Sequence, residues 1–172
     1  YHSFINFFNF FIFTEIIKII RLNPSRRIIY QIYICRNESK FLIEIWGSNC
    51  NFWSDIFLNA RGNININVAQ PQELILAKQL RNSYLALKVA FFNQIYDYCK
   101  REEVDFESVR RIITQDKRIG DSHSHVTEKR GFGGHCFPKD TLATLRSSQV
   151  AGAEISLLHE AIEYNNKVRI WK

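Results

Sequence analysis

The chain has 172 residues and a formal net charge of +6 at pH 7, with 46% hydrophobic and 23% charged residues. This composition excludes a disordered chain and predicts a globular protein of one domain, or parts of two. The positive charge suits an anionic small ligand, but no more than two basic residues are consecutive, so a nucleic-acid-binding protein is not expected.

The chain starts at Tyr1 and contains no methionine, so we expect it to be a piece of a longer protein. Its four cysteines are irregularly spaced and form no C-x-x-C pair. This spacing favours reduced thiols over a disulfide framework and predicts a cytoplasmic location.

The first predicted element is a buried helix in the apolar stretch of residues 4–20. Polar residues interrupt this stretch at Asn6, Asn9, Glu15 and Lys18. It therefore lacks the run of about 18 apolar residues that a membrane span needs, and it has no basic start or cleavage site of a signal peptide.

The segments that follow alternate between strand and helix patterns. Residues 26–34 are rich in β-branched and aromatic side chains and predict a strand. Residues 38–46 predict a helix, and the alternating residues 63–68 predict a second strand. This order is typical of an α/β arrangement.

A long helix is predicted over residues 72–100, directly after Pro71. The segment contains no glycine or proline, and Glu73 suits the first turn. Apolar residues lie on nearly every side, so we expect most of its circumference to be buried.

Two further helices and a loop are predicted downstream. Asp105 is expected to cap a helix from Phe106 that places Val109, Ile112 and Ile113 on one face. Residues 118–134 show no helical or strand period and predict a loop.

The chain is expected to end in two helices. One follows Pro138 with Asp140 as its N-cap. The last has a single apolar stripe that contains Ile155, Leu158, Ala161 and Ile162. The predicted fold class is thus mainly α with a small α/β remnant and a long central helix.

The motif GFGGHCFPKD, residues 131–140, contains three of the seven glycines and Cys136. A nearby lysine and a helix N-terminus both lower the pKa of a thiol, and Lys139 and the following helix are predicted to supply them. Cys136 is therefore a candidate nucleophile. The alternative is a tight turn that contains a small buried cysteine.

Lys78 and Asn82 lie four residues apart and project from the same face of the long helix. A lysine on a mostly buried helix needs a partner or a task, although one near the helix start can also extend its amine to solvent. Arg118 follows a helix directly and could contact a phosphate or a neighbouring subunit, or be an ordinary surface arginine.

Two other site types are not predicted. The glycine cluster is no dinucleotide-binding fingerprint, because Cys136 stands where the third glycine would be. His123, His125 and His135 with Cys136 match no standard zinc spacing, so no metal is expected.

Taken together, the long helix with Lys78 and Asn82, the "RIG" at 118–120 and the cysteine motif resemble the central part of the UDP-glucose/GDP-mannose dehydrogenase family. The similarity is strong over residues 71–145. Upstream, residues 13–15 and 22–29 resemble the end of that family's nucleotide-binding domain. The resemblance implies that residues 1–69 are the C-terminal remnant of an α/β dinucleotide-binding domain, and residues 70–172 the central helical dimerisation domain.

The resemblance also implies a chemistry. Members of the family oxidise the primary alcohol of a nucleotide sugar in two steps with two NAD. Cys136 would form a thiohemiacetal and then a thioester, while Lys78 would stabilise the oxyanion. Asp140 would act with Lys78 on the hydrolytic water, and Asn82 would orient a substrate oxygen.

Further residues are implied to bind ligands. The substrate would be UDP-glucose, with GDP-mannose and UDP-N-acetylmannosamine left open. Lys139 would lie beside the NAD cofactor, and Arg118 would reach the substrate of the partner in a homodimer. The other implied substrate contacts are Glu15, which matches the second of two family glutamates while Phe11 replaces the first, and Gly131, Phe132 and Gly133.

Two other functions compete with this one. The chain could be a non-catalytic helical dimerisation module or a decayed gene product, or a thiol hydrolase that pairs Cys136 with a histidine. Because the cofactor fingerprint is missing from the sequence, we expect the 172-residue chain alone to be inactive.

Overall fold

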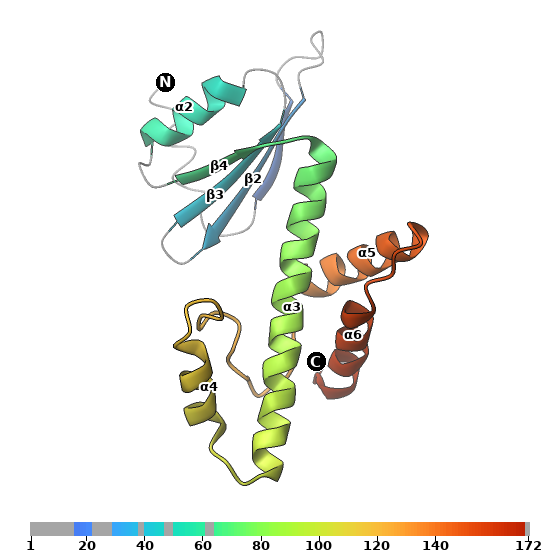
Figure 1. Cartoon of the computed structure of the whole chain (residues 1–172). Helices are drawn as coiled ribbons and strands as arrows, with labels where there is room; N and C mark the ends of the chain where they lie inside the picture. The colour runs from blue at the N-terminus through green and yellow to red at the C-terminus, as the bar shows by residue number, and fades with distance from the viewer. Residues whose placement is uncertain (1–15, 22–28, 38–39, 47–49, 61–63, 171–172) are drawn as a thin grey trace. The chain divides into compact units, whose positions relative to one another are not determined.

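The computed structural model describes residues 16–21, 29–37, 40–46, 50–60 and 64–170 (Figure 1). The chain divides into two compact units, with the division after Ile75. The helices within the described residues greatly outweigh the strands, and the predicted fold class, mainly α with a small α/β part and a long central helix, is confirmed.

The first unit is built on a four-stranded sheet in the order β1-β2-β3-β4. β1 (Ile16–Arg21) pairs antiparallel with β2 (Ile29–Asn37), which pairs antiparallel with β3 (Lys40–Trp46). β4 (Ile64–Val68) runs parallel to β3, and helix α2 (Cys50–Ala60) forms the crossover between them.

The core of this unit contains Ile43, Ile45, Trp53 and Phe57, from β3 and α2. The predicted strand at 26–34 is confirmed over 29–34 by β2, and the one at 63–68 is confirmed over 64–68 by β4. Residues 26–28 and 63 lie outside the described residues. The predicted helix at 38–46 is wrong, because residues 40–46 form β3. The predicted helix at 4–20 is wrong over 16–20, which belong to β1, and its earlier part lies outside the described residues.

The second unit is organised around α3 (Pro71–Arg101), which confirms the predicted long helix. The rings of Tyr96 and Phe106, the first residue of α4 (Phe106–Thr114), pack nearly at right angles with centroids 5.3 Å apart. On another side, α3 contributes Ala86 and Ala90 to an apolar core with α5 (Cys136–Val150) and α6 (Ser156–Val168). The remaining buried members of this core are Phe132, Leu145, Leu158, Ala161 and Ile162.

One side of α3 is exposed among the described residues of the second unit. Tyr84, Phe91 and Tyr98 are 64%, 58% and 64% exposed. The expectation that most of this helix would be buried therefore fails for the chain by itself, since the other elements of the second unit cover only part of its circumference.

The shorter helices confirm some sequence predictions and correct others. Asp105 caps α4 as predicted, because its carboxylate accepts a hydrogen bond from the Ser108 N–H at 2.9 Å. Ile112 is 69% exposed, so it does not belong to the buried face of α4, whereas Arg110 is buried. The apolar stripe of α6 is confirmed by the burial of Leu158, Ala161 and Ile162.

The start of α5 differs from the prediction. The helix begins at Cys136, and its N-cap residue is His135, so Asp140 is not the cap. Pro138 lies in the first turn, where the missing N–H breaks no helical hydrogen bond. Asp140 consequently lies about one turn inside the helix and is 3% exposed.

Candidate functional site

A buried polar contact joins α3 to α5. The Asn82 amide donates to Asp140 Oδ2 at 2.6 Å, and the Ser83 hydroxyl donates to Thr144 Oγ1 at 3.1 Å. Asp140 and Thr144 are one helical turn apart, so both point to the same side of α5. Hydrogen-bonded polar side chains therefore fix how these two helices meet.

The carboxylate of Asp140 is the electrostatic centre of this contact. Its Oδ1 accepts a hydrogen bond from Lys139 Nζ at 2.7 Å. Burial alone would raise the pKa of Asp140, but the hydrogen bonds from Lys139 and Asn82, with the charges of Lys139 and Lys78, outweigh burial and lower it. Asp140 is therefore an ionised carboxylate at neutral pH.

Three of the five predicted catalytic or cofactor residues, Asn82, Lys139 and Asp140, are joined directly by hydrogen bonds. The charge of Lys78 acts on Asp140, and Lys78 precedes Asn82 by about one turn of α3. Cys136 precedes Asp140 by about one turn and is the first residue of α5. Cys136 is partly exposed and reduced, and it stands at the N-terminus of a helix, a position that in general favours a thiolate.

The glycine loop, defined here as residues 130–135, leads into Cys136. The Gly131 N–H donates to Asn93 Oδ1 at 3.0 Å, and the Phe132 N–H donates to Asn165 Oδ1 at 2.6 Å. Gly131 has a φ of +53°, and a Cβ at this residue would lie 2.2 Å from Asn165 Oδ1, so only glycine fits.

The predicted substrate contacts in this loop have different surroundings. The Phe132 side chain is 3% exposed and belongs to the apolar core. A Cβ at Gly133 would lie 2.2 Å from Arg169 Nη2, so the backbone approaches that guanidinium closely. The structure thus directs the Phe132 ring away from solvent and places Gly133 beside a cation.

Two predicted substrate contacts lie elsewhere. Arg118 is exposed over 90% of its side chain and pairs with Asp116, two residues earlier, at 2.5 Å. Glu15 lies outside the described residues.

Sequence reasoning missed Asn93, Asn165 and Arg169, which hold the glycine loop. Asn93 interrupts an apolar run on α3, as Asn82 does, and this polar interruption was the available signal. Asn165 and Arg169 lie 33 and 39 positions after their partners Phe132 and Arg130, and no local pattern connects them with the loop.

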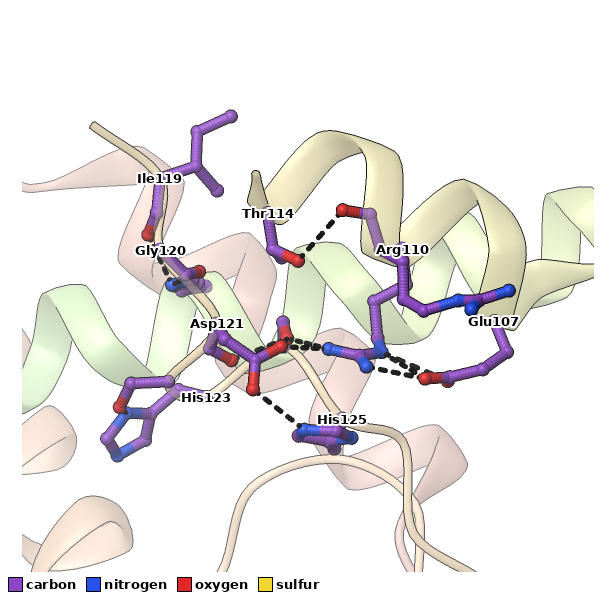
Figure 2. Close-up of polar contacts among 12 residues, drawn as sticks. Glu107, Arg110, Thr114, Ile119, Gly120, Asp121, His123 and His125 are labelled. Carbon is purple, nitrogen blue, oxygen red and sulfur yellow. Dashed lines mark hydrogen bonds and ion pairs between the residues drawn. The ribbon is translucent and has the colours of Figure 1, made fainter. Parts of the chain in front are cut away.

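A second polar cluster surrounds Arg110 of α4 (Figure 2). Its guanidinium donates to Glu107 and Asp121 and, at 2.9 Å, to the Ser124 hydroxyl. His125 in turn contacts Asp121 Oδ2 at 3.2 Å (Figure 2). This cluster attaches the loop after α4 to the helix itself.

The histidines do not gather around a common point. The His123 ring lies over Phe137, with centroids 5.6 Å apart, and its Nδ1 is 2.6 Å from the Ser122 hydroxyl. Burial, with the charge of Lys88, lowers the pKa of His123. Within the described residues, no group of three or more His, Cys, Asp or Glu side chains could hold a metal ion. No helix in the same part of the chain is long and apolar enough to span a membrane.

Comparison with known proteins matches the second unit to a family. The sequence model of the central domain of the UDP-glucose/GDP-mannose dehydrogenase family matches residues 73–167. UDP-glucose 6-dehydrogenase TuaD of Bacillus subtilis (strain 168) is 38% identical over 95 residues, which are 55% of this chain and 20% of TuaD. UDP-glucose 6-dehydrogenase of Pseudomonas aeruginosa is 39% identical over 95 residues, with the same coverage of 55% and 20%.

A solved structure is also similar. The UDP-glucose dehydrogenase of the hyperthermophilic archaeon Pyrobaculum islandicum gives a TM-score of 0.62 at 30% sequence identity. The similarity covers 76% of this chain and 30% of that chain. The match to the two bacterial relatives spans about a fifth of their length, 20% in each case.

Proposed function

Because the chain belongs to the UDP-glucose/GDP-mannose dehydrogenase family, we propose that it supplies the central, cysteine-bearing part of an NAD-dependent UDP-glucose 6-dehydrogenase. The substrate class follows from the names of the similar proteins, which are UDP-glucose dehydrogenases. Residues 1–69 would be the end of the dinucleotide-binding domain, and residues 70–172 the central helical domain.

One observation carries the proposal: a buried, ionised Asp140 is held by Lys139 and Asn82, within the field of Lys78, about one turn from Cys136. A route through a thioester needs a nucleophilic sulfur, a cation near the developing oxyanion and a carboxylate near the water. Cys136, Lys78 and Asp140 are of these three kinds and belong to the same helix junction.

The covalent step assigned to this chain begins with an aldehyde at C6 of the sugar. The thiolate of Cys136 adds to the carbonyl carbon, and the carbonyl oxygen becomes an oxyanion that takes a proton to give a thiohemiacetal. Lys78 stabilises that oxyanion, and Asn82 donates to a substrate oxygen. When a thioester is hydrolysed, Asp140 and Lys78 orient the water, and the Cys136 thiolate leaves.

The residues present do not form a cradle for NAD. A dinucleotide-binding turn uses the pattern G-x-G-x-x-G between a strand and a helix, and this pattern occurs nowhere in the 172 residues. We therefore assign no oxidation step to this chain. Lys139 is proposed to lie beside the nicotinamide end of NAD, and the 172-residue chain alone is expected to form no NADH.

The remaining parts of the proposal concern partners and place. The exposed apolar side of α3 supports a homodimer through the central helical domain, in which Arg118 would reach the partner's substrate. Gly131 and Gly133, with the Phe132 backbone and Glu15, would line the substrate site. The four cysteines are irregularly spaced and form no C-x-x-C pair, which supports a cytoplasmic location. A non-catalytic dimerisation module is the second candidate, favoured by the same exposed side of α3.

The two candidates differ in the chemistry of Cys136, which an alkylation assay measures. The 172-residue chain is treated with iodoacetamide, with and without the C6 aldehyde of UDP-glucose, and labelling of each cysteine is followed by peptide mass spectrometry. We expect Cys136 to label faster than buried Cys99, and the aldehyde to protect Cys136 alone.

Two variants test the role of the cation. Lys78→Met should weaken protection by the aldehyde by about tenfold or more, because one oxyanion stabiliser is lost. Lys100→Met removes an exposed lysine at the far end of the same helix and should leave protection unchanged. Labelling of Cys136 no faster than Cys99, without protection, would establish the dimerisation module instead.

A further inference from the structure

The glycine loop has a backbone conformation that needs support from outside. Arg130, Gly131 and Gly134 have φ values of 55°, 53° and 81°. Glycine adopts this left-handed region readily, but for arginine it is unfavourable. Such a conformation persists only where surrounding contacts determine it.

The first of these contacts comes from Asn93 of α3, which is 1% exposed. Its Oδ1 accepts hydrogen bonds from the Gly131 N–H and from Arg130 Nε, both at 3.0 Å. Its Nδ2 donates to the carbonyl of Val89 at 2.8 Å, so the oxygen of the amide is the atom that faces the loop.

The Arg130 side chain is held on the same face of α3. Its Nη2 lies 2.8 Å from both carboxylate oxygens of Asp97, and its guanidinium carbon lies 4.9 Å from the centre of the Tyr96 ring. Asn93, Tyr96 and Asp97 follow the spacing i, i+3, i+4, so one helix face holds the whole side chain.

The second set of contacts comes from α6 and the residue that follows it. Asn165, which is 2% exposed, accepts the Phe132 N–H on Oδ1 at 2.6 Å. Arg169 Nη1 donates to the carbonyls of Arg130 and Gly131, at 2.7 and 3.2 Å. Two successive N–H groups of the loop are thus bound by buried amides from two different helices.

We propose that Asn93 and Asn165 are positioning residues, which fix the glycine loop and through it the sulfur of Cys136 at the start of α5. The step from loop to sulfur is short, because Phe132 is bound to Asn165 and only residues 133–135 separate it from Cys136. The catalytic meaning of this role rests on the proposed function, whereas the clamp itself does not.

The test combines two substitutions at Asn93 with two measurements. Asn93→Leu keeps the branching at Cγ and removes the acceptor, and Asn93→Asp keeps the acceptor oxygen. The first measurement is amide hydrogen exchange at Gly131 and Phe132. We expect Asn93→Leu to accelerate exchange at Gly131 by about tenfold, as loss of one buried hydrogen bond does, and Asn93→Asp to restore slow exchange.

The second measurement is the pH at which Cys136 is alkylated at half its maximal rate. This pH midpoint depends on the fraction of the sulfur present as thiolate and not on how accessible the sulfur is. Asn93→Leu should raise this midpoint by about half a pH unit, since a frayed first turn no longer presents its dipole to the sulfur. Asn93→Asp should return it to the wild-type value. Ser124→Ala is the matched control, because Ser124 is buried and hydrogen-bonded but contacts the Arg110 cluster, not the glycine loop.

The proposal would be overturned if Asn93→Leu left amide exchange at Gly131 unchanged, or accelerated it without raising the pH midpoint of Cys136 alkylation. The same changes in Ser124→Ala would also overturn it. Should Asn93→Leu fail to fold, Gly131→Ala breaks the clamp from the loop side, because its Cβ meets Asn165 Oδ1, and should raise the midpoint equally. Rapid exchange of Gly131 and Phe132 in the wild type would also overturn the proposal. If instead the wild-type midpoint of Cys136 equals that of Cys99, the proposed function fails, while hydrogen exchange still decides on the clamp.

Discussion

At the scale of single residues, Tyr164 shows how a partly buried hydrogen-bond network shifts the pKa of a side chain. Its hydroxyl donates to Asp97 Oδ2 at 2.9 Å, and Arg130 Nη2 lies 3.4 Å from the same hydroxyl. Burial, with the hydrogen bond and charge of Asp97, raises the pKa of Tyr164 from 10.0 to about 12, although Arg130 acts in the opposite direction. The fold therefore favours the neutral phenol.

This shift predicts a loss of stability in alkali. A pKa that is higher in the folded state contributes stability that is complete below the unfolded value of 10.0 and is lost as the pH rises through about 12. Tyr164→Phe should cost about 1 kcal/mol at neutral pH and remove this decline. Urea unfolding at a series of alkaline pH values measures both. Tyr98→Phe, which removes an exposed hydroxyl, should keep the wild-type decline, and an equal decline in Tyr164→Phe would contradict the assignment.

At the scale of elements, Arg110 joins α4 to the loop that follows it (Figure 2). The Arg110 side chain is 6% exposed, while its ion-pair partners Glu107 and Asp121 are 52% and 62% exposed. Hydrogen bonding to Arg110 lowers the pKa of both carboxyl groups. The guanidinium is thus the buried centre of the cluster, with carboxylates at its solvent side.

Arg110→Met should lower the free energy of unfolding by about 2 kcal/mol, because the buried hydroxyl of Ser124 loses its charged partner and the carboxylates lose theirs. Chemical denaturation measures this change. Arg118→Met is the matched control, since Arg118 also pairs with an aspartate but is 90% exposed, and its effect should be much smaller. Equal effects of the two substitutions would show that burial does not set the strength of the Arg110 cluster.

The sequence predicted elements well where local signals decide the structure. Asp105 caps α4 through its own carboxylate, and α3 follows from a long segment without glycine or proline after Pro71. Prediction failed for β3, where Ile43, Glu44 and Ile45 are all buried in succession. A strand covered on both faces has no alternation, so periodicity could not distinguish it from a helix.

The candidate site was predictable only in part, because some of its contacts join segments that are far apart in the sequence. Lys78, Asn82 and Cys136 stood out because polar or reactive residues interrupt apolar or glycine-rich patterns. For Asp140 the local pattern alone predicts a helix cap, because it does not reveal the α3 amide that binds Asp140 across 58 positions. Contacts between distant segments depend on the packing of helices, which no local pattern encodes.

At the scale of the whole molecule, α3 carries an apolar stripe that is exposed in the described part of the chain. Its members are spaced by four or seven residues and so share one face of the helix. They are Leu76, Leu80, Tyr84, Phe91 and Tyr98, each at least 40% exposed. Such a seam is typical of helices that pair, and it supports the proposed homodimer.

The dimer predicts a clear effect of charge on this stripe. Phe91→Glu places a carboxylate in the middle of the seam, where pairing of two copies would bury it beside its equivalent, so the dissociation constant should rise by about a hundredfold or more. Sedimentation equilibrium over a range of concentrations measures that constant. Leu157→Glu changes a 73% exposed leucine on α6 and should leave the association unchanged.

Because Phe91 is 58% exposed, the Phe91→Glu substitution leaves the apolar core of the second unit intact, and an unaltered circular dichroism spectrum would confirm this. A wild-type chain that stays monomeric at all concentrations would overturn the homodimer. A Phe91→Glu variant that associates as well as the wild type would place the contact between copies elsewhere than on α3.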